Sequence, residues 1–134
     1  MKTHTVDGMP RALLRLTSQG GINYPDFVVG KGARDNDELS TKIAEPLDYW
    51  FHVEEYSGSH VIIRCPLGIE PPPEIVRYAA QLAAWHSKAR GAGGKIEVHQ
   101  CLARDVSKPR GYEPGKVQIR NWTTIKVYAK DPDA

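Results

Sequence analysis

The sequence predicts an α+β fold, a single domain in which two helices pack on a largely antiparallel β-sheet. Two observations predict this fold class. The expected strands follow one another as hairpins, whereas a parallel sheet would need strands that alternate one by one with helices. The 134 residues also contain no internal repeat and no linker that would separate two domains.

The first half of the chain is expected to hold two short strands and a helix. Residues 12–17 alternate weakly as a first strand, and the short apolar segment 26–29, bounded by Pro and Gly, predicts a second. A helix is expected over about residues 33–44, because acidic side chains occupy its first turns and Pro46 stops it.

Residues 48–64 predict a β-hairpin whose two strands are joined by a short loop containing Gly58. Period-two alternation directs Tyr49, Phe51 and Val53 toward a core. The opposite face then gathers an aromatic ring, two imidazoles and a guanidinium, from Trp50, His52, His60 and Arg64. Because this mixture can stack on bases and contact phosphates, the sequence predicts a recognition surface on that face.

The clearest helix is expected from Pro73 or Glu74 to Ala89. Proline is tolerated at the first helical position, a carboxylate suits the positive end of the helix dipole, and apolar residues recur on one stripe. The glycine-rich residues 91–94 end this helix. A strand over residues 95–102 follows, and the chain closes with a hairpin around Asn121 and Trp122, built from residues 116–120 and 123–128.

Charge is distributed unevenly along the chain, although the net charge is only +2. Residues 86–130 hold ten Lys and Arg against three Asp and Glu, so this segment carries +7 and the remainder about −5. A basic segment favours a polyanion as partner, because binding releases counterions. A solvated basic face that keeps the protein soluble is the alternative.

The sequence also indicates a compartment. No apolar run approaches the roughly 20 residues needed to span a bilayer, and the first residues lack the apolar segment of a secretory signal. Cys65 and Cys101 form no Cys-x-x-Cys pair and are expected to be reduced thiols. We therefore expect a cytoplasmic protein without a membrane partner.

The segment Gly30-Lys31-Gly32 lies between a predicted strand and a predicted helix. Backbone N–H groups at a helix N-terminus bind anions, glycines allow a phosphate to approach closely, and Lys31 and Arg34 would add positive charge. The segment matches neither a nucleotide P-loop nor a dinucleotide-binding fingerprint. An ordinary turn is the alternative interpretation.

Two further groups of side chains are candidate contacts to a polyanion. Lys88 and Arg90 close the predicted second helix, where the helix dipole alone explains one cation. The loop over residues 108–116 presents Lys108, Arg110 and Tyr112 and is stiffened by two prolines. A basic loop with a central aromatic ring suits single-stranded or looped RNA, because stacking contributes about 1–3 kcal/mol per base. A solvated connection between strands is the alternative.

The sequence shows no catalytic motif and no metal-binding motif. Its His and Cys residues lack the paired short spacings of a structural zinc site, and Ser59 lacks a nucleophile-elbow pattern. One imidazole of the hairpin can instead anchor the loop by bonding backbone groups. We expect no catalytic residue, no metal and no cofactor.

Several segments, in order along the chain, resemble one known domain family. They are Asn36-Asp37-Glu38-Leu39, Asp48-Tyr49-Trp50-Phe51-His52, and residues 58–64, 79–90, 106–111 and 114–117. Together they span roughly residues 28–128 and are similar to the RNA-binding (R) domain of the NFACT proteins. That family includes ribosome quality-control factors that handle tRNA on stalled large subunits, so the resemblance implies RNA binding.

Complete NFACT proteins also carry a large N-terminal domain, a helix-hairpin-helix region and a long coiled coil, for which 134 residues leave no room. The tRNA-dependent tailing activity of the complete factors is therefore not implied. We predict a stand-alone module over residues 1–134 that binds tRNA or rRNA in translation, ribosome quality control or tRNA metabolism. Three alternatives remain open: a subunit that delivers tRNA to an RNA-modifying enzyme, a module that docks on a ribosome-associated protein, and an enzyme acting alone. The sequence leaves the oligomeric state open.

Overall fold

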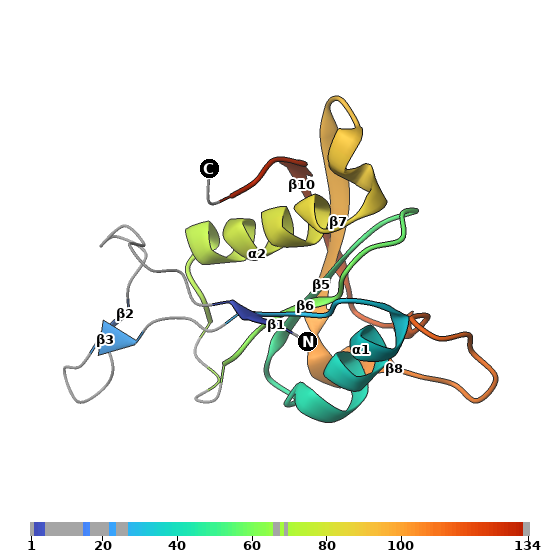
Figure 1. The fold of residues 1–134 in the computed structure, drawn as a ribbon. Helices are drawn as coiled ribbons and strands as arrows, with labels where there is room; N and C mark the ends of the chain where they lie inside the picture. Colours follow the sequence, from blue (N-terminus) through green and yellow to red (C-terminus); the bar gives the residue numbers. More distant parts are fainter. Residues whose placement is uncertain are drawn as a thin grey trace.

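The computed structural model describes residues 2–4, 15–16, 22–23, 27–65, 68 and 70–132. Within them, six strands form one antiparallel sheet in the order β1-β4-β6-β5-β7-β10 (Figure 1). In chain order these strands are β1 (Lys2–His4), β4 (Phe27–Val29), β5 (Tyr49–Val53), β6 (Val61–Ile63), β7 (Lys95–Leu102) and β10 (Thr123–Tyr128). The predicted α+β class with a largely antiparallel sheet is confirmed.

Helical segments cover both faces of this sheet. Figure 1 shows α2 (Pro73–Trp85) on one face and α1 (Ala33–Glu38) on the other, where α1 continues into the π-helical turn η2 (Leu39–Ile43). Because both faces are covered, the central strands β4 and β6 are buried at every position, and their sequences are the continuous apolar runs Phe-Val-Val and Val-Ile-Ile. The helix predicted over residues 33–44 is confirmed as α1 with η2.

Alternating side chains of the strands build two separate cores. One lies under α2 and contains Phe27, Phe51 and Val53 packed with apolar residues of the helix. The alanines of α2 let the helix approach the sheet closely, and four of them are fully buried: Ala79, Ala80, Ala83 and Ala84. The other core lies under η2 and contains Val28, Leu39, Trp50, Ile62 and Cys101. The alternation of residues 48–64 was therefore predicted correctly, and both faces of the hairpin are covered.

The helix α2 begins at Pro73 as predicted but ends at Trp85, before the expected Ala89. The loop of the hairpin explains the earlier end. The Ser59 N–H donates to the His86 carbonyl at 2.9 Å, and the Lys88 N–H donates to the Ser57 carbonyl at 2.8 Å. These backbone groups bond the loop instead of continuing the helix, and the chain forms the 3-10 turn η3 (Lys88–Gly91).

The prediction of a hairpin between residues 116–120 and 123–128 is wrong, because these strands pair with other strands. The two-residue strand β9 (Gln118–Ile119) pairs with β8 (Val106–Ser107), which follows the 3-10 turn η4 (Ala103–Asp105). Strand β10 instead pairs with β7 along all six of its residues. The physical reason is burial, because this position lets Ile125 and Val127 join the core under α2.

The N-terminal predictions are tested only in part. The strand expected over residues 26–29 is confirmed as β4, and β7 matches the expected residues 95–102. Of residues 12–17, only Arg15 and Leu16 lie within the described part of the chain, where they form β2 and pair with β3 (Ile22–Asn23). Strand β1, which pairs with β4 at the edge of the sheet, was not predicted.

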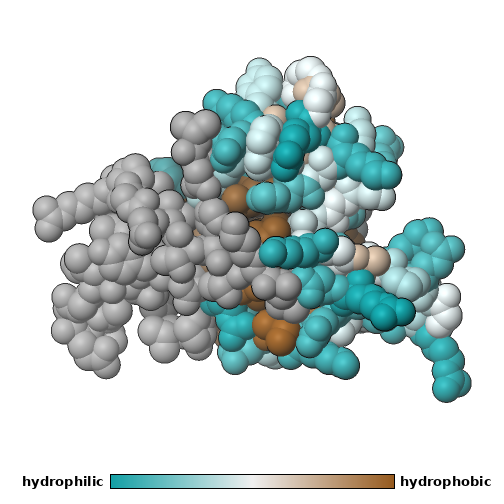
Figure 2. All heavy atoms as spheres, in the orientation of Figure 1, coloured by the Kyte–Doolittle hydropathy of each residue, from teal (hydrophilic) through white to brown (hydrophobic). Residues whose placement is uncertain are grey.

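The described part of the face drawn in Figure 2 is mostly hydrophilic, with a narrow strip of hydrophobic residues near its middle. Among the described residues, no helix combines the length and the apolar character needed to cross a membrane.

Candidate nucleic-acid interface

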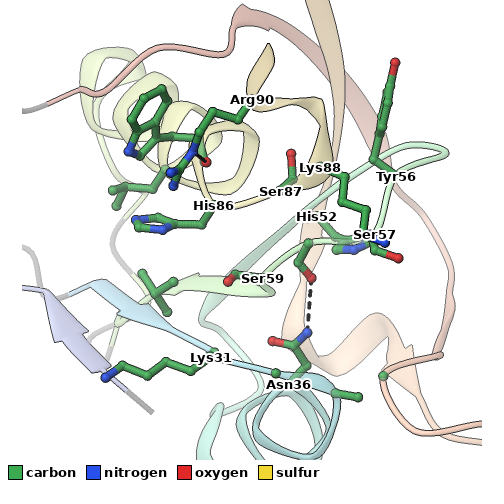
Figure 3. Close-up of a pocket in the computed structure, with 18 of the residues that line it drawn as sticks. Lys31, Asn36, His52, Tyr56, Ser57, Ser59, His86, Ser87, Lys88 and Arg90 are labelled. Carbon is green, nitrogen blue, oxygen red and sulfur yellow. Dashed lines mark hydrogen bonds between the residues drawn. The ribbon is translucent and has the colours of Figure 1, made fainter. Parts of the chain in front are cut away.

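A hollow of about 1180 Å³ brings together four segments that are far apart in the sequence. They are the turn between β4 and α1 (residues 30–33), the hairpin loop (residues 55–59), the end of α2 with η3 (residues 82–90) and the base of a long loop (residues 113–116). We call this hollow the groove; Figure 3 shows Lys31, Ser59, Lys88 and Arg90 around it. Three of the segments singled out in the sequence therefore meet here.

The groove is shaped by close backbone contact between the hairpin loop and the end of α2. Gly58 forms an isolated bridge with Ser87, in addition to the two hydrogen bonds that end the helix. A Cβ atom on Gly58 would lie 2.5 Å from the Ser87 Cβ atom, closer than any normal contact. Only glycine therefore fits at this position without displacing Ser87.

Asn36 holds the same loop from the other side. Its side-chain amide donates to the Gly58 carbonyl at 3.1 Å, and its side-chain oxygen accepts from the His60 N–H at 3.0 Å (Figure 3 shows the first of these bonds). A Cβ atom on Gly30 would lie 2.1 Å from that side-chain oxygen, so Gly30 makes room for the amide. Gly30 thus has a packing role, separate from any contact of the turn with a phosphate.

The prediction of an exposed recognition surface on the hairpin is wrong for Trp50 and His60, which are only 2% and 1% exposed. The Trp50 indole N–H donates to the Ser40 hydroxyl at 2.8 Å, and Ser40 Oγ lies 2.7 Å from His60 Nδ1. An indole N–H can only donate, so the Ser40 hydroxyl accepts from Trp50, and the same hydroxyl also bonds the His60 imidazole. Burial lowers the pKa of His60 to about 3, so the imidazole is neutral and serves the alternative role of anchoring the loop.

Arg64 also has structural partners instead of an open surface. Its guanidinium donates to the Ile43 carbonyl at 3.1 Å and lies 3.7 Å from Asp48 and 3.8 Å from Glu45. Asp48 is buried, and its two oxygens accept from the N–H groups of Cys65 and Glu45. Arg64 therefore compensates a buried carboxylate that ties the ends of the hairpin together.

The prediction that the loop presents Lys108 to a ligand is also wrong, because the Lys108 side chain folds back onto its own loop and onto Asp37. Its ammonium contacts the Asp37 carboxylate at 3.2 Å and donates to the carbonyls of Glu113 and Lys116. The Gly115 N–H donates to the same Asp37 oxygen at 3.1 Å. An ammonium has three N–H donors, so these contacts satisfy Lys108 and fold the loop against α1.

The remaining predicted residues are accessible. Lys31, Lys88 and Arg90 are exposed and line the groove, and half-buried His52 lines it as well. Burial lowers the pKa of His52 to about 4, so this ring contributes hydrogen bonding without charge at neutral pH. Arg34 is exposed but is not part of the groove lining. Arg110 and Tyr112 are exposed near the tip of the long loop.

The lining is mixed in charge, and this decides which cations are available. Lys116 lies 3.4 Å from Glu113, and Glu55 and Asp131 also line the groove. Among the residues that the structure describes, no carboxylate forms an ion pair with Lys31, Lys88 or Arg90. These three exposed side chains are therefore the groove cations without an ion pair in this part of the chain, although the Lys31 backbone N–H donates to the nearby Asp35 carboxylate at 3.0 Å.

Three aromatic residues of the groove were missed by the sequence interpretation: Tyr56, Trp85 and His86. Trp85 was assigned only to the predicted helix, and His86 was placed near its apolar stripe. Helical periodicity gives the face of a residue but not the loop that comes to lie beside it. The signal available was the spacing of two aromatic rings and two cations over residues 85–90.

The described residues hold no group of three or more His, Cys, Asp or Glu side chains placed to bind a metal ion. Cys65 and Cys101 are buried and form no disulfide within the described residues, and they belong to the two different cores. Burial raises the pKa of Cys101 to about 12, which keeps this thiol protonated.

Comparison with known proteins supplies the family. Residues 22–121 match the family model described as NFACT protein RNA binding domain. The chain belongs to this family. The NFACT RNA-binding domain thus covers β3 through the turn before β10, including every segment of the groove except Asp131 near the C-terminus.

Relatives agree with this assignment. The chain is 40% identical over 101 residues to the Rqc2 homolog RqcH of Streptococcus suis and 37% identical over 108 residues to RqcH of Bacillus subtilis. These alignments cover 75% and 81% of this chain but 18% of each relative, so the chain spans less than a fifth of their length. The solved structure of the C-terminal part of the fibronectin/fibrinogen-binding protein from Streptococcus suis matches with a TM-score of 0.74 and 35% identity. That match covers 90% of this chain and 46% of the other.

Proposed function

We propose that this NFACT RNA-binding domain binds structured RNA, tRNA or rRNA, in the groove, and that it does so in ribosome quality control or tRNA metabolism in the cytoplasm. The observation that supports the proposal is that one hollow of a chain in an RNA-binding family is lined by Lys31 from the β4–α1 turn and by Lys88 and Arg90 from η3, none of which forms an ion pair within the described residues. The proposed role is binding, without a catalytic step by this chain.

The chemistry of the groove suits a sugar–phosphate backbone. Lys31 comes from the β4–α1 turn and Lys88 from the start of η3, and Figure 3 shows them at different parts of the lining, so an extended run of phosphates along the groove meets both cations. Arg110, exposed on the long loop whose base lines the groove, is counted as a fourth contact. Four phosphate contacts predict that the logarithm of the affinity falls with the logarithm of salt concentration with a slope of about −3 for unpaired RNA.

Fluorescence anisotropy with labelled tRNA at several salt concentrations tests this proposal. The double variant Lys31→Ala/Lys88→Ala should reduce the magnitude of the slope by about 1.4. The matched control is Lys95→Ala/Lys126→Ala, which removes two exposed lysines of β7 and β10 that do not line the groove. Equal losses in both double variants would refute the groove as the RNA site, and no RNA binding by the unaltered chain at low salt would refute RNA binding altogether.

A further inference from the structure

Arg90 has an arrangement that its position at a helix end does not explain. Its guanidinium carbon lies 4.0 Å from the centre of the Trp85 ring, and its Nε–H donates to the Trp85 carbonyl at 2.7 Å. One face of the planar guanidinium is therefore covered by the indole, and the hydrogen bond fixes the orientation of the plane. A cation that only completed the helix dipole would need neither contact.

The other side of Arg90 is open to the groove. The side chain is exposed, and no carboxylate pairs with it among the described residues. Figure 3 shows the Arg90 and His86 side chains at the same end of the groove, with Ser59 and Lys31 farther along it. His86 is also exposed at this end of the groove.

We propose that the Trp85–Arg90 pair is a stacking site for one unpaired nucleobase of the bound RNA. The inference rests on the proposed RNA-binding function, and it adds which class of RNA the groove selects. A base on the open face of Arg90 would extend the stack of indole and guanidinium, while its flanking phosphates lie toward Lys88 and Lys31.

The stacking site makes the groove selective for loops and unpaired ends. A base inside a duplex already stacks on its neighbours and presents no free face, so it cannot occupy the Arg90 plane without being unpaired. The ligand class is therefore RNA with an unpaired nucleotide, and the contact is tolerant of base identity because every base has a π-face.

The substitution Arg90→Lys tests the site, because it keeps the charge and removes the plane. The probes are an RNA stem-loop with adenines in its loop and the same stem-loop with abasic loop residues, which carry the same phosphates. The unaltered chain should bind the adenine loop about tenfold more tightly than the abasic loop. Arg90→Lys should bind the two alike, and the loss should persist at high salt, since stacking releases no counterions.

The matched control is Arg77→Lys, the same chemical change at a residue of α2 that lines a different hollow. It should leave the preference for the adenine loop unchanged. Salt-dependent RNA binding without any preference for the adenine loop, or a preference that survives Arg90→Lys, would overturn the stacking site and leave the proposed function standing. Binding of neither stem-loop at low salt would overturn both.

Discussion

Ser40→Ala probes the buried network that holds the groove in place. Ser40 is 5% exposed, and its hydroxyl accepts from the Trp50 indole N–H and bonds His60 Nδ1. Alanine fits the same space but has no hydroxyl. The substitution therefore leaves two buried ring nitrogens, one of Trp50 and one of His60, without this partner.

The size of the effect follows from these two groups. Each buried polar group without a partner costs about 1–3 kcal/mol, and the better helix propensity of alanine recovers about 0.5 kcal/mol. We therefore expect Ser40→Ala to lower the free energy of unfolding by about 1.5–5.5 kcal/mol. With an m-value of about 2 kcal/mol per M, such a loss shifts the midpoint of urea unfolding down by about 1–3 M.

Urea unfolding followed by circular dichroism measures this loss. The matched control is Thr41→Ala at the next position, because the exposed Thr41 hydroxyl donates to the Asp37 carbonyl and, within the described part of the chain, bonds no other group. We expect the control to stay within about 0.5 kcal/mol of the unaltered chain. A loss for Ser40→Ala as small as that of the control would show that the Trp50–Ser40–His60 network does not stabilise the fold.

Three further predictions follow from the described contacts. Burial lowers the pKa of His60 to about 3 in the folded chain, whereas the same imidazole in the unfolded chain binds a proton near pH 6.5. The free energy of unfolding should therefore fall by about 2 kcal/mol from pH 7.5 to pH 5 on account of this residue. An NMR titration of His60 with a midpoint near pH 6.5 in the folded chain would contradict this. Gly58→Ala should lower the free energy of unfolding by about 1–3 kcal/mol through the contact with Ser87, and an unchanged melting temperature would show that the loop yields freely. Lys108→Ala should lower the free energy of unfolding by about 1–2 kcal/mol without changing the salt slope of RNA binding. Arg110→Ala should reduce the magnitude of that slope by about 0.7 and leave stability unchanged. The reverse pattern would show that Lys108, and not Arg110, contacts the RNA.

The local sequence pattern was sufficient to predict the strands and the helix whose signals lie within their own residues. The alternation of residues 48–64 and 95–102 and the proline at the start of α2 each predicted an element that the structure contains. The local pattern could not predict which strands, distant in the sequence, pair with one another. Strand β10 pairs with β7 instead of its nearest neighbour in sequence, because burial of Ile125 and Val127 under α2 outweighs the short connection of a hairpin.

The candidate site shows the same division. Alternation correctly placed Trp50 opposite Phe51, but it could not reveal that Leu39 and Ser40 would cover that face and bury the ring. The direction of Lys108 depends on Asp37, which belongs to a helix in the other half of the chain. Charge and loop chemistry therefore located the segments of the groove, while the tertiary contacts decided which of their side chains are free to bind.

An NMR titration of the isotope-labelled chain with tRNA tests the central claim most directly, because it locates the bound surface residue by residue. Binding in the groove predicts that the amide signals of residues 30–32, 57–59 and 86–90 change on addition of tRNA. The signals of Gln100 and Ile125, which line the hollow at the start of α2, should stay unchanged. Changes confined to Gln100, Ile125 and their surroundings, or no changes at all at low salt, would contradict the account.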